Sequence, residues 1–569
     1  MGEKPWLQHY SAGMAHEIDA DAYPSIWAMS AEAIAKFGDA PAFSNFGADL
    51  SYRDIDRLSE NLAAYLQGEL GLKKGDRVAI MVPNIMAFPV TMFANIRAGL
   101  VQVNVNPLYT ARELQHQLND ADTDTIVIFS GSTPVLAEII ADTPIKNVIV
   151  ANLGDCGNSA LPSPPCDERL GQVINFADAV ELGEKLSFSP VEISGGDLLF
   201  LQYTGGTTGL SKGAALSHRN LVANILQFSA LTSGHIREGE EVVITALPLY
   251  HIFALMVNCL TYFIKGGRNV LITNPRDMPG FVAELANWKF SVFTGVNTLF
   301  NGLLHTPGFA ELDFSNLSLI GGGGTAIQAA ISNKWREVTG KHITEGYGLS
   351  ETSPVVTFNE LGRDEFTATI GIPMPSTDVS LRGEDGQEVA QGEPGELCVK
   401  GPQVMVGYWR QEGETAAVTT PDGYFRTGDL GILTEDGRFK IVDRIKDMIL
   451  VSGFNVFPNE IEAVVATMDG VLEAACIGVP DDRTDEAVKL FVVKTAGLEV
   501  SADAVIAHCR ENLTAYKVPR QIAFIDELPK SPVGKILRRE LRDKTTRQDD
   551  CMAGNRRIWK SHGNRLYLP

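Results

Sequence analysis

Hydrophobic residues recur along this chain with two different spacings. Residues 23–37 and 53–67 carry apolar side chains every three or four positions, which predicts amphipathic helices. Short apolar runs bounded by polar or turn-forming residues predict buried strands, and they lie at 76–84, 124–131, 147–153, 196–204, 241–249, 268–274 and 290–296. Because these strands alternate with helices, the first part of the chain predicts an α/β fold with parallel or mixed sheets covered by helices.

The pattern changes in the second half of the chain. From about residue 378 to 442, β-type segments separated by glycine-containing turns predict a small strand-rich subdomain. A helix is predicted from Pro458, which suits a first helical turn, and Ile461 and Val465 fall on one face of it. We therefore expect a large N-terminal domain at 1–442, a hinge at 443–447, a small mobile α+β domain at 448–545 and a disordered tail at 546–569.

Composition and charge restrict the class of protein. With 569 residues, 44% hydrophobic and 21% charged, the chain matches a soluble globular protein of more than one domain, without an apolar run that could span a membrane. A net charge of −22 argues against nucleic acid as the main partner. The seven cysteines lack C-x-x-C spacing and the N-terminus lacks an apolar signal-peptide core, so we expect a cytoplasmic protein with reduced thiols. Peripheral membrane contact and a homodimer remain open.

A loop rich in glycine and hydroxyl residues follows the strand predicted at 196–204, and a helix capped by Ser217 is expected after it. It does not match a Walker A loop, G-x-x-x-x-G-K-[ST], because Lys212 is preceded by Ser211 and followed by Gly213. Glycines allow close backbone approach, while threonines and a lysine offer donors and a mobile charge to a phosphate chain, so a plain linker is the weaker interpretation. The candidate phosphate-binding residues are Thr204, Gly205, Gly206, Thr207, Thr208, Gly209 and Lys212.

The segment YTGGTTGLSKG, at 203–213, resembles the signature loop of the adenylate-forming enzymes. That superfamily includes acyl-CoA synthetases, firefly luciferase and the adenylation domains of peptide synthetases, and the wider context is similar to bacterial long-chain fatty acid–CoA ligases. The resemblance extends over about residues 5–545, because further motifs follow in the family's order. They are LPLYHIF (247–253), GGGGT (321–325), EGYGLSE (345–351), YFRTGD (424–429), VDRIKDMI (442–449), SGFNVFPNEIE (452–462) and PKSPVGKILRR (529–539).

The resemblance implies nucleotide contacts in several of these motifs. Tyr347, an aromatic residue between two glycines, would stack on the base, and Glu351, a hard oxygen ligand, would bind Mg²⁺ together with Thr204. Asp429 would accept hydrogen bonds from the ribose hydroxyls, and Arg444 would donate to them. The other expected ATP or CoA contacts are Gly323, Gly324, Gly348, Ser350, where the family more often has threonine, and Gly453.

The resemblance also implies a division of labour between two half-reactions. Lys535 would hold the substrate carboxylate against the α-phosphate, because a cation between two anions lowers their repulsion. Rotation about the hinge, with Lys446 as its pivot, would then replace Lys535 by the Gly453 side, where a missing side chain leaves a passage for the pantetheine arm of CoA. His251 would orient the substrate carboxylate, with a purely structural role as the alternative.

These expectations predict a long-chain fatty acid–CoA ligase that uses ATP, Mg²⁺ and CoA. The fatty acid carboxylate would attack the α-phosphate of ATP and release pyrophosphate, and CoA would then convert the acyl-AMP to acyl-CoA and AMP. The alternatives within the superfamily are an enzyme that passes its acyl group to a carrier protein and a medium-chain or aryl-CoA ligase. Outside it, the alternative is a nucleotide-binding or fatty-acid-binding protein without catalysis, against which the presence of both Lys212 and Lys535 argues.

Overall fold

The computed structural model describes residues 4–11, 14–204, 211–363, 365–481, 483–531 and 534–545. The tail predicted at 546–569 lies outside the described residues. Contacts within the chain define two compact units. Unit 1 comprises Met1–Thr427 with Ile432–Ile441, and unit 2 comprises Gly428–Gly431 with Val442–Pro569.

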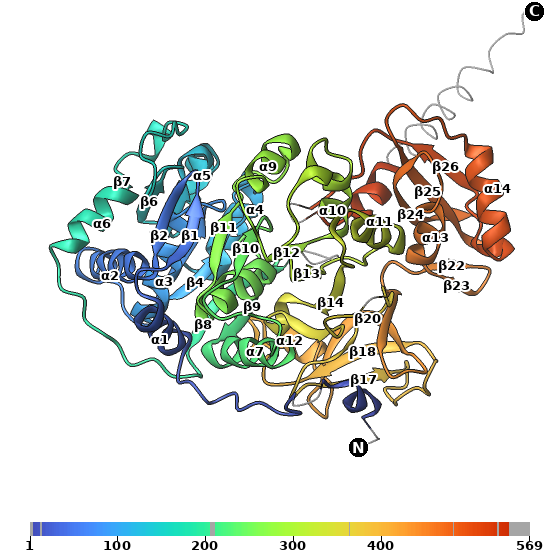
Figure 1. Cartoon of the computed structure of the whole chain (residues 1–569), viewed down its shortest axis with the longest axis horizontal. Helices are drawn as coiled ribbons and strands as arrows, with labels where there is room; N and C mark the ends of the chain where they lie inside the picture. Colours follow the sequence, from blue (N-terminus) through green and yellow to red (C-terminus); the bar gives the residue numbers. More distant parts are fainter. Residues whose placement is uncertain are drawn as a thin grey trace, which may run out of the picture. The chain divides into compact units, whose positions relative to one another are not determined.

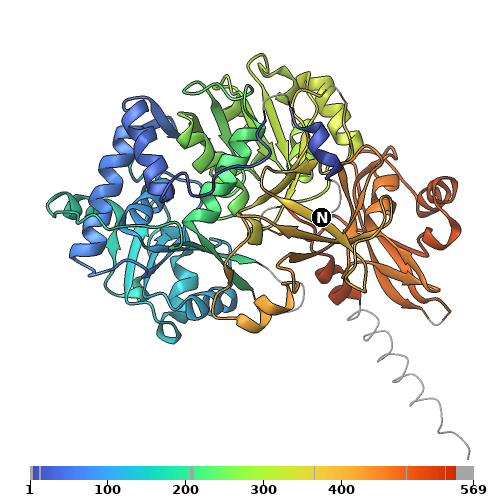
Figure 2. The same cartoon turned by 90° about the horizontal axis from the view of Figure 1, so that it is seen from below.

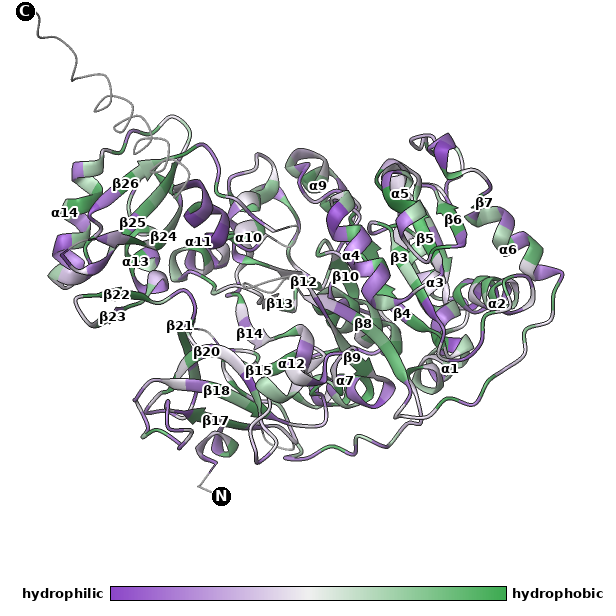
Figure 3. Ribbon diagram, turned by 180° about the vertical axis from the view of Figure 1, so that it is seen from behind, coloured by the Kyte–Doolittle hydropathy of each residue, from purple (hydrophilic) through white to green (hydrophobic). Residues whose placement is uncertain are grey.

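Unit 1 is built on two large mixed sheets (Figure 1). The first has the order β16-β15-β14-β13-β12-β10-β11-β1-β2, and its strands are parallel from β14 to β1. The second has the order β19-β9-β8-β4-β3-β5-β6-β7, and its strands are parallel from β8 to β7. Because such strands are covered on both faces, they read as apolar runs in the sequence, and Figure 3 colours the central strands mainly as hydrophobic.

The strands of the first sheet are β1 (Pro41–Asn45), β2 (Ala48–Ser51), β10 (Val242–Thr245), β11 (Arg268–Leu271), β12 (Val292–Gly295), β13 (Leu319–Gly322), β14 (Thr344–Gly348), β15 (Val355–Phe358) and β16 (Ile372–Pro373). Those of the second are β3 (Arg77–Met81), β4 (Val101–Asn104), β5 (Thr125–Phe129), β6 (Asn147–Ala151), β7 (Ile174–Asn175), β8 (Leu198–Thr204), β9 (Lys212–Ser217) and β19 (Gly407–Tyr408). The strands predicted between 76 and 296 are therefore confirmed.

The helices of unit 1 are α1 (Ile26–Phe37), α2 (Tyr52–Gly68), α3 (Ala87–Ala98), α4 (Ala111–Ala121), α5 (Thr133–Ile139), α6 (Phe176–Glu184), α7 (His218–Leu231), α8 (Thr261–Ile264), α9 (Met278–Leu285), α10 (Asn297–Leu304), α11 (Ala329–Thr339) and α12 (Glu412–Ala417). The predicted helices at 23–37 and 53–67 are confirmed as α1 and α2. The start of α2 is determined locally, because Ser51 and Asp54 form a capping box there.

An unpredicted strand lies between the glycine-rich loop and α7. After the loop, the chain returns as β9, antiparallel to β8, so that Lys212 lies opposite Thr204. The prediction of a strand and a helix on either side of the loop is therefore incomplete, because β9 (KGAALS) consists of residues with weak strand preference and forms by pairing with β8 and β19. The cap at Ser217 is confirmed, since its hydroxyl accepts a hydrogen bond from the backbone N–H of Asn220 at 3.2 Å.

A smaller sheet has the order β17-β18-β20-β21, with strands β17 (Asp378–Arg382), β18 (Gly395–Lys400), β20 (Phe425–Leu433) and β21 (Phe439–Arg444). The strand-rich character predicted for this part of the chain is confirmed. The N-terminal helix η1 (Pro5–His9) lies on this sheet, far from it in sequence, as Figure 2 shows from below. Its Trp6 is buried in one cluster with Val379 and Leu397.

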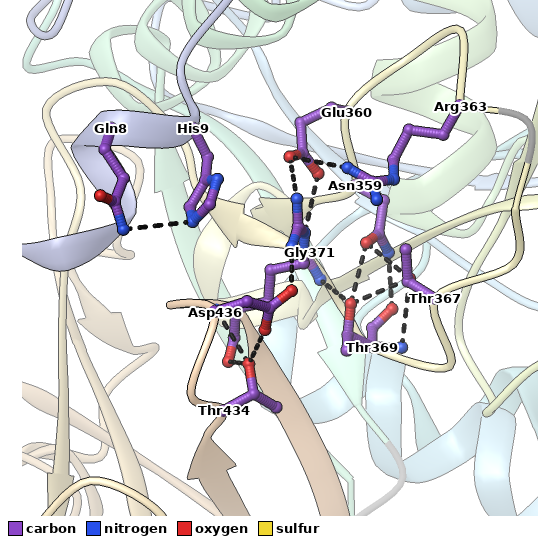
Figure 4. Close-up of polar contacts among 11 residues, drawn as sticks. Gln8, His9, Asn359, Glu360, Arg363, Thr367, Thr369, Gly371, Thr434 and Asp436 are labelled. Carbon is purple, nitrogen blue, oxygen red and sulfur yellow. Dashed lines mark hydrogen bonds and ion pairs between the residues drawn. The ribbon is translucent and has the colours of Figure 1, made fainter.

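A polar network holds the described residues of the connection between β15 and β16, 359–363 and 365–371 (Figure 4). The buried Arg438 guanidinium donates to the two carboxylate oxygens of Glu360 at 2.5 and 3.1 Å, and it also pairs with Asp436. The side-chain oxygen of Asn359 accepts hydrogen bonds from two threonine hydroxyls of the same segment. A buried bidentate ion pair is costly to break once formed, so it holds this segment against the turn between β20 and β21.

Unit 2 contains a sheet of order β23-β22-β25-β24 with β26 beside β25. Its elements are β22 (Ile449–Val451), β23 (Phe454–Val456), α13 (Pro458–Val465), β24 (Val471–Asp481), β25 (Asp485–Lys494), α14 (Ala502–Asn512) and β26 (Gln521–Phe524). The helix predicted from Pro458 is confirmed, with Ile461 and Val465 buried. The α/β fold class, with a large sheet-based domain and a small α+β domain, is confirmed. No helix in the described part of the chain is long and apolar enough to cross a membrane.

Candidate active site

Several predicted nucleotide contacts lie at the carboxyl end of two adjacent strands. Strands β13 and β14 are parallel, with Gly322 opposite Glu345. Gly323 and Gly324 follow β13, Tyr347 and Gly348 end β14, and Ser350 and Glu351 form the next turn, η7 (Ser350–Thr352). Parallel strands bring such residues to one edge of the sheet, which is the usual location of ligand sites in α/β folds.

Packing also explains why glycines flank Tyr347. A Cβ on Gly346 would lie 2.3 Å from the Phe358 ring, and one on Gly348 would lie 1.9 Å from the carbonyl oxygen of Pro354. The Phe358 ring and the Pro354 carbonyl therefore occupy the space that a side chain at Gly346 or Gly348 would need.

Lys212 and Glu351 belong to one charged cluster in unit 1. The Lys212 ammonium pairs with the carboxylate of Glu414, on α12, and lies 5.2 Å from the centre of the Tyr408 ring. The Tyr408 hydroxyl donates a hydrogen bond of 2.9 Å to Oε1 of the buried Glu351. Burial, followed by the charge of Glu351, raises the pKa of Tyr408, so it stays a protonated donor.

Sequence reasoning identified Lys212 and Glu351 but missed their two neighbours. Tyr408 and Glu414 lie about two hundred residues beyond Lys212 and carry no local motif of their own. The pairing of β19 with β9 brings Tyr408 to the cluster, and Glu414 follows on α12. The segment GYW, at 407–409, did not identify Tyr408 as a site residue, because an ordinary β-type segment gives the same pattern.

His251 lies in the segment between β10 and the helical turn Phe253–Leu260. Its Nδ1 accepts a hydrogen bond of 3.3 Å from the backbone N–H of Phe253. Buried amides hold this segment: Asn84 donates to the carbonyl oxygens of Thr245 and Leu247, and Gln202 donates to that of Tyr250 at 2.9 Å. These amides position the segment carrying His251, and sequence reasoning missed them because each is a lone polar residue in an apolar run.

Five of the predicted phosphate contacts, Gly205, Gly206, Thr207, Thr208 and Gly209, lie outside the described residues. The two ends of their loop are described. Thr204 ends β8, and the carbonyl oxygen of Ser211 lies 2.8 Å from Nε2 of His116, on α4. Through His116, helix α4 therefore contacts the C-terminal end of the loop.

In unit 2, the two predicted ribose contacts lie together. Nε of Arg444 is 3.2 Å from a carboxylate oxygen of Asp429, and Asp429 is buried. This ion pair places a hydrogen-bond acceptor and a donor at one point, which is what a ribose diol requires.

The segment carrying Lys535 is also fixed within unit 2. The backbone N–H of Lys535 donates to the Ser531 hydroxyl at 3.1 Å, and the N–H of Ser531 donates to the Lys535 carbonyl at 2.7 Å. Three residues later, Arg538 is bound to the buried carboxylate of Glu462 at 2.8 Å. Gly453 lies at the tip of the β22–β23 hairpin with φ of +81°, and a Cβ at this position would have no atom within 4 Å.

Glu345, at the start of the EGYG segment, is a buried carboxyl group. Its Oε1 accepts one hydrogen bond, from the backbone N–H of Ile327 at 3.1 Å. Burial raises the pKa of Glu345 to about 8, against the opposing effect of that hydrogen bond. The neutral acid is therefore favoured in the folded protein.

Glu345→Gln is expected to remove a pH-dependent loss of stability. An unfolded glutamate has a pKa of about 4.3, whereas burial raises the folded-state pKa of Glu345 to about 8. The contribution of the raised pKa to the free energy of unfolding is therefore complete below about pH 4.3 and is lost as the pH rises through about 8. Between about pH 5 and pH 8, the wild-type free energy of unfolding should fall by roughly 3 kcal/mol relative to the variant. Thermal unfolding of both proteins across this range measures the difference, and parallel pH profiles would contradict it.

Most of the chain matches known protein families. Residues 30–409 match the AMP-binding enzyme family, and residues 460–535 match the AMP-binding enzyme C-terminal domain. The long-chain-fatty-acid–CoA ligase of Salmonella typhimurium is 48% identical over 562 residues, covering 97% of this chain and 100% of that protein. The ligase of the same name from Yersinia pestis is 49% identical over 553 residues, covering 95% and 98%.

A solved structure shares the fold. The crystal structure of ATP-bound MatB from Rhodopseudomonas palustris superposes with a TM-score of 0.79 at 29% identity, covering 93% of this chain and 99% of that one. The family match spans more than half of the chain, and the two bacterial relatives are similar over nearly their whole lengths. This chain therefore belongs to the AMP-binding enzyme family.

Proposed function

We propose that this protein is a long-chain fatty acid–CoA ligase that works through an acyl-AMP intermediate. The observation that carries the proposal is the cluster in which Lys212 and the buried Glu351 both contact Tyr408, beside the end of the glycine-rich loop. It offers a mobile cation and a carboxylate ligand to a polyphosphate, in a chain that is 48% identical to a ligase of this name. The Asp429–Arg444 pair supports a ribose contact.

In the first half-reaction, a carboxylate oxygen of the fatty acid attacks the α-phosphorus of ATP. A C–O–P linkage forms, the bond between the α-phosphorus and the bridging oxygen breaks, and pyrophosphate leaves with the electron pair. Lys212 leaves Glu414 to bind the phosphates, Tyr347 stacks on the adenine, and Lys535 holds the reacting anions together. Positioning and charge stabilisation of this kind supply several kcal/mol of barrier lowering without an enzyme nucleophile.

In the second half-reaction, the CoA sulfur attacks the carbonyl carbon of the acyl-AMP. A C–S bond forms, AMP leaves with the electron pair of the C–O bond, and the thiol proton passes to solvent. We propose that the C-terminal domain rotates about 443–447, with Lys446 as the pivot. This rotation would withdraw Lys535 from the reacting groups and bring the face that carries Gly453 to them. An exposed hairpin tip without a side chain at Gly453 suits the passage of the pantetheine arm.

Mg²⁺ fits the donor set of this site. The described residues contain no group of three or more His, Cys, Asp or Glu that could hold a metal ion by themselves. Mg²⁺ commonly takes one or two carboxylates and completes its shell with substrate phosphates and water. Glu351, with Thr204, would hold it here, and when bound it would neutralise charge on the phosphates.

A chain-length series of carboxylic acids tests the substrate assignment. Each acid, from acetate to oleate and including benzoate and ferulate, is incubated with MgATP and CoA, and acyl-CoA, AMP and pyrophosphate are quantified. We expect equal amounts of the three products, with the highest kcat/KM for long chains. A preference for an aromatic or medium-chain acid would favour that branch of the family, and AMP release without acyl-CoA would favour a carrier protein as the acceptor.

A further inference from the structure

Tyr408 bridges two residues that the proposed chemistry uses and that lie far apart in sequence. It stands on β19 opposite Ala214 of β9, two residues from Lys212. Side chains two apart on a strand share a face, so the Tyr408 ring lies diagonally beside Lys212, with the ammonium 5.2 Å from its centre. The hydroxyl of the same side chain donates to Oε1 of Glu351 at 2.9 Å.

The backbone around Tyr408 is held on both sides. We call residues 405–409 the strap. Three of its backbone N–H groups donate to carbonyl oxygens: Met405 to Glu351 (2.8 Å), Val406 to Ala215 (3.0 Å) and Trp409 to Gly213 (2.8 Å). The N–H of Tyr408 itself donates to the Thr415 hydroxyl at 2.9 Å, on the helix that carries Glu414. The strap therefore places Tyr408 at a fixed distance from both β9 and Glu351.

The hydroxyl of Tyr408 determines how the Glu351 carboxylate is turned. Glu351 is buried, and an ionised carboxylate only accepts hydrogen bonds, so a donor on Oε1 selects one orientation of the group. Partners that orient a metal-binding carboxylate commonly change metal affinity by about 10–100-fold. The Tyr408 ring has a separate role, because it supports Lys212 whether or not the hydroxyl is present.

We propose that Tyr408 is a positioning residue that couples the metal-binding carboxylate of Glu351 to the phosphate-binding Lys212. The proposal rests on the proposed function, since it assumes that the cluster receives MgATP. In this proposal Tyr408 acts through Glu351 and Lys212 rather than as a ligand of the metal or a contact of the reacting atoms. It sets the carboxylate through its hydroxyl and the ammonium through its ring.

The test measures nucleotide binding without turnover. Calorimetry with α,β-methylene-ATP gives a Kd in excess Mg²⁺ and a Kd in EDTA, and their ratio is the enhancement of affinity by the metal. Tyr408→Phe keeps the ring and removes one oxygen, so its enhancement should fall about tenfold while its Kd in EDTA stays within about twofold of wild type. The midpoint of thermal unfolding should not change.

Two further variants locate the effect. In a Glu351→Gln background, adding Tyr408→Phe should change the enhancement no further, because the partner of the hydroxyl has already lost its charge. Tyr424→Phe is the matched control: its hydroxyl also donates to a carboxylate, Asp378, at 3.1 Å, but away from the cluster, so its enhancement should equal that of wild type.

Three results would overturn the proposal. They are an unchanged enhancement in Tyr408→Phe, an equal further loss in the Glu351→Gln background, and a Tyr408→Phe protein that does not fold, which would make the hydroxyl structural. A wild-type protein without any enhancement by Mg²⁺ would instead remove the proposed function on which this role rests.

Discussion

Lys535→Ala is expected to lower fatty-acid-dependent pyrophosphate release by about a thousandfold, since removing one preorganised charge from a charge-rich transition state has an effect of this size. The same variant should convert supplied acyl-AMP and CoA to acyl-CoA within about twofold of the wild-type rate, because we propose that Lys535 serves only the first half-reaction. Both half-reactions are measured separately, the first as pyrophosphate release and the second from synthetic oleoyl-AMP.

The fold around Lys535 should survive this substitution. The main chain of Lys535 is held by its two hydrogen bonds with Ser531, which do not involve the lysine side chain. Lys544→Ala removes a lysine from the same C-terminal segment at an exposed position and serves as the charge-matched control. Equal slowing of both half-reactions by Lys535→Ala would contradict the proposal that the C-terminal domain presents Lys535 for adenylation and the Gly453 side for thioester formation.

Gly453→Trp should have the opposite profile. Acyl-CoA formation from supplied acyl-AMP is expected to fall by about a hundredfold, because an indole at the hairpin tip would block or misplace the pantetheine arm, whereas adenylation should stay within about twofold. Stopped assays of the two half-reactions measure both rates.

Gly453→Ala separates bulk from backbone strain. The φ of +81° makes any side chain at this position strained, by on the order of 1 kcal/mol, but a methyl group would meet no atom within 4 Å. The alanine variant should therefore retain most of its thioester formation. Normal thioester formation by Gly453→Trp would exclude a passage at this hairpin.

Sequence reasoning predicted the elements whose signals are local. The apolar runs of β3 and β8, the cap at Ser217 and the first helical turn at Pro458 each depend on neighbouring residues, and the structure contains all of them. Strand β9 was missed because its glycine, alanine and serine residues have little strand preference, so that its pairing partners determine its conformation.

The same distinction applies to the site. Lys212 and Glu351 stand in recognisable motifs, whereas Tyr408, Glu414 and the buried amide of Gln202 act through contacts between distant segments. A single sequence carries no record of those contacts, because any polar residue in an apolar strand gives the same pattern. Glu345 is a further example, since only its burial in the fold moves its pKa to about 8.

The exchange of labelled pyrophosphate into ATP tests the central claim most directly, because it reports reversible formation of an acyl-AMP without CoA. We predict exchange that requires both Mg²⁺ and a long-chain fatty acid and that Lys535→Ala lacks. ATP turnover without exchange, whichever carboxylic acid is supplied, would contradict the adenylation mechanism.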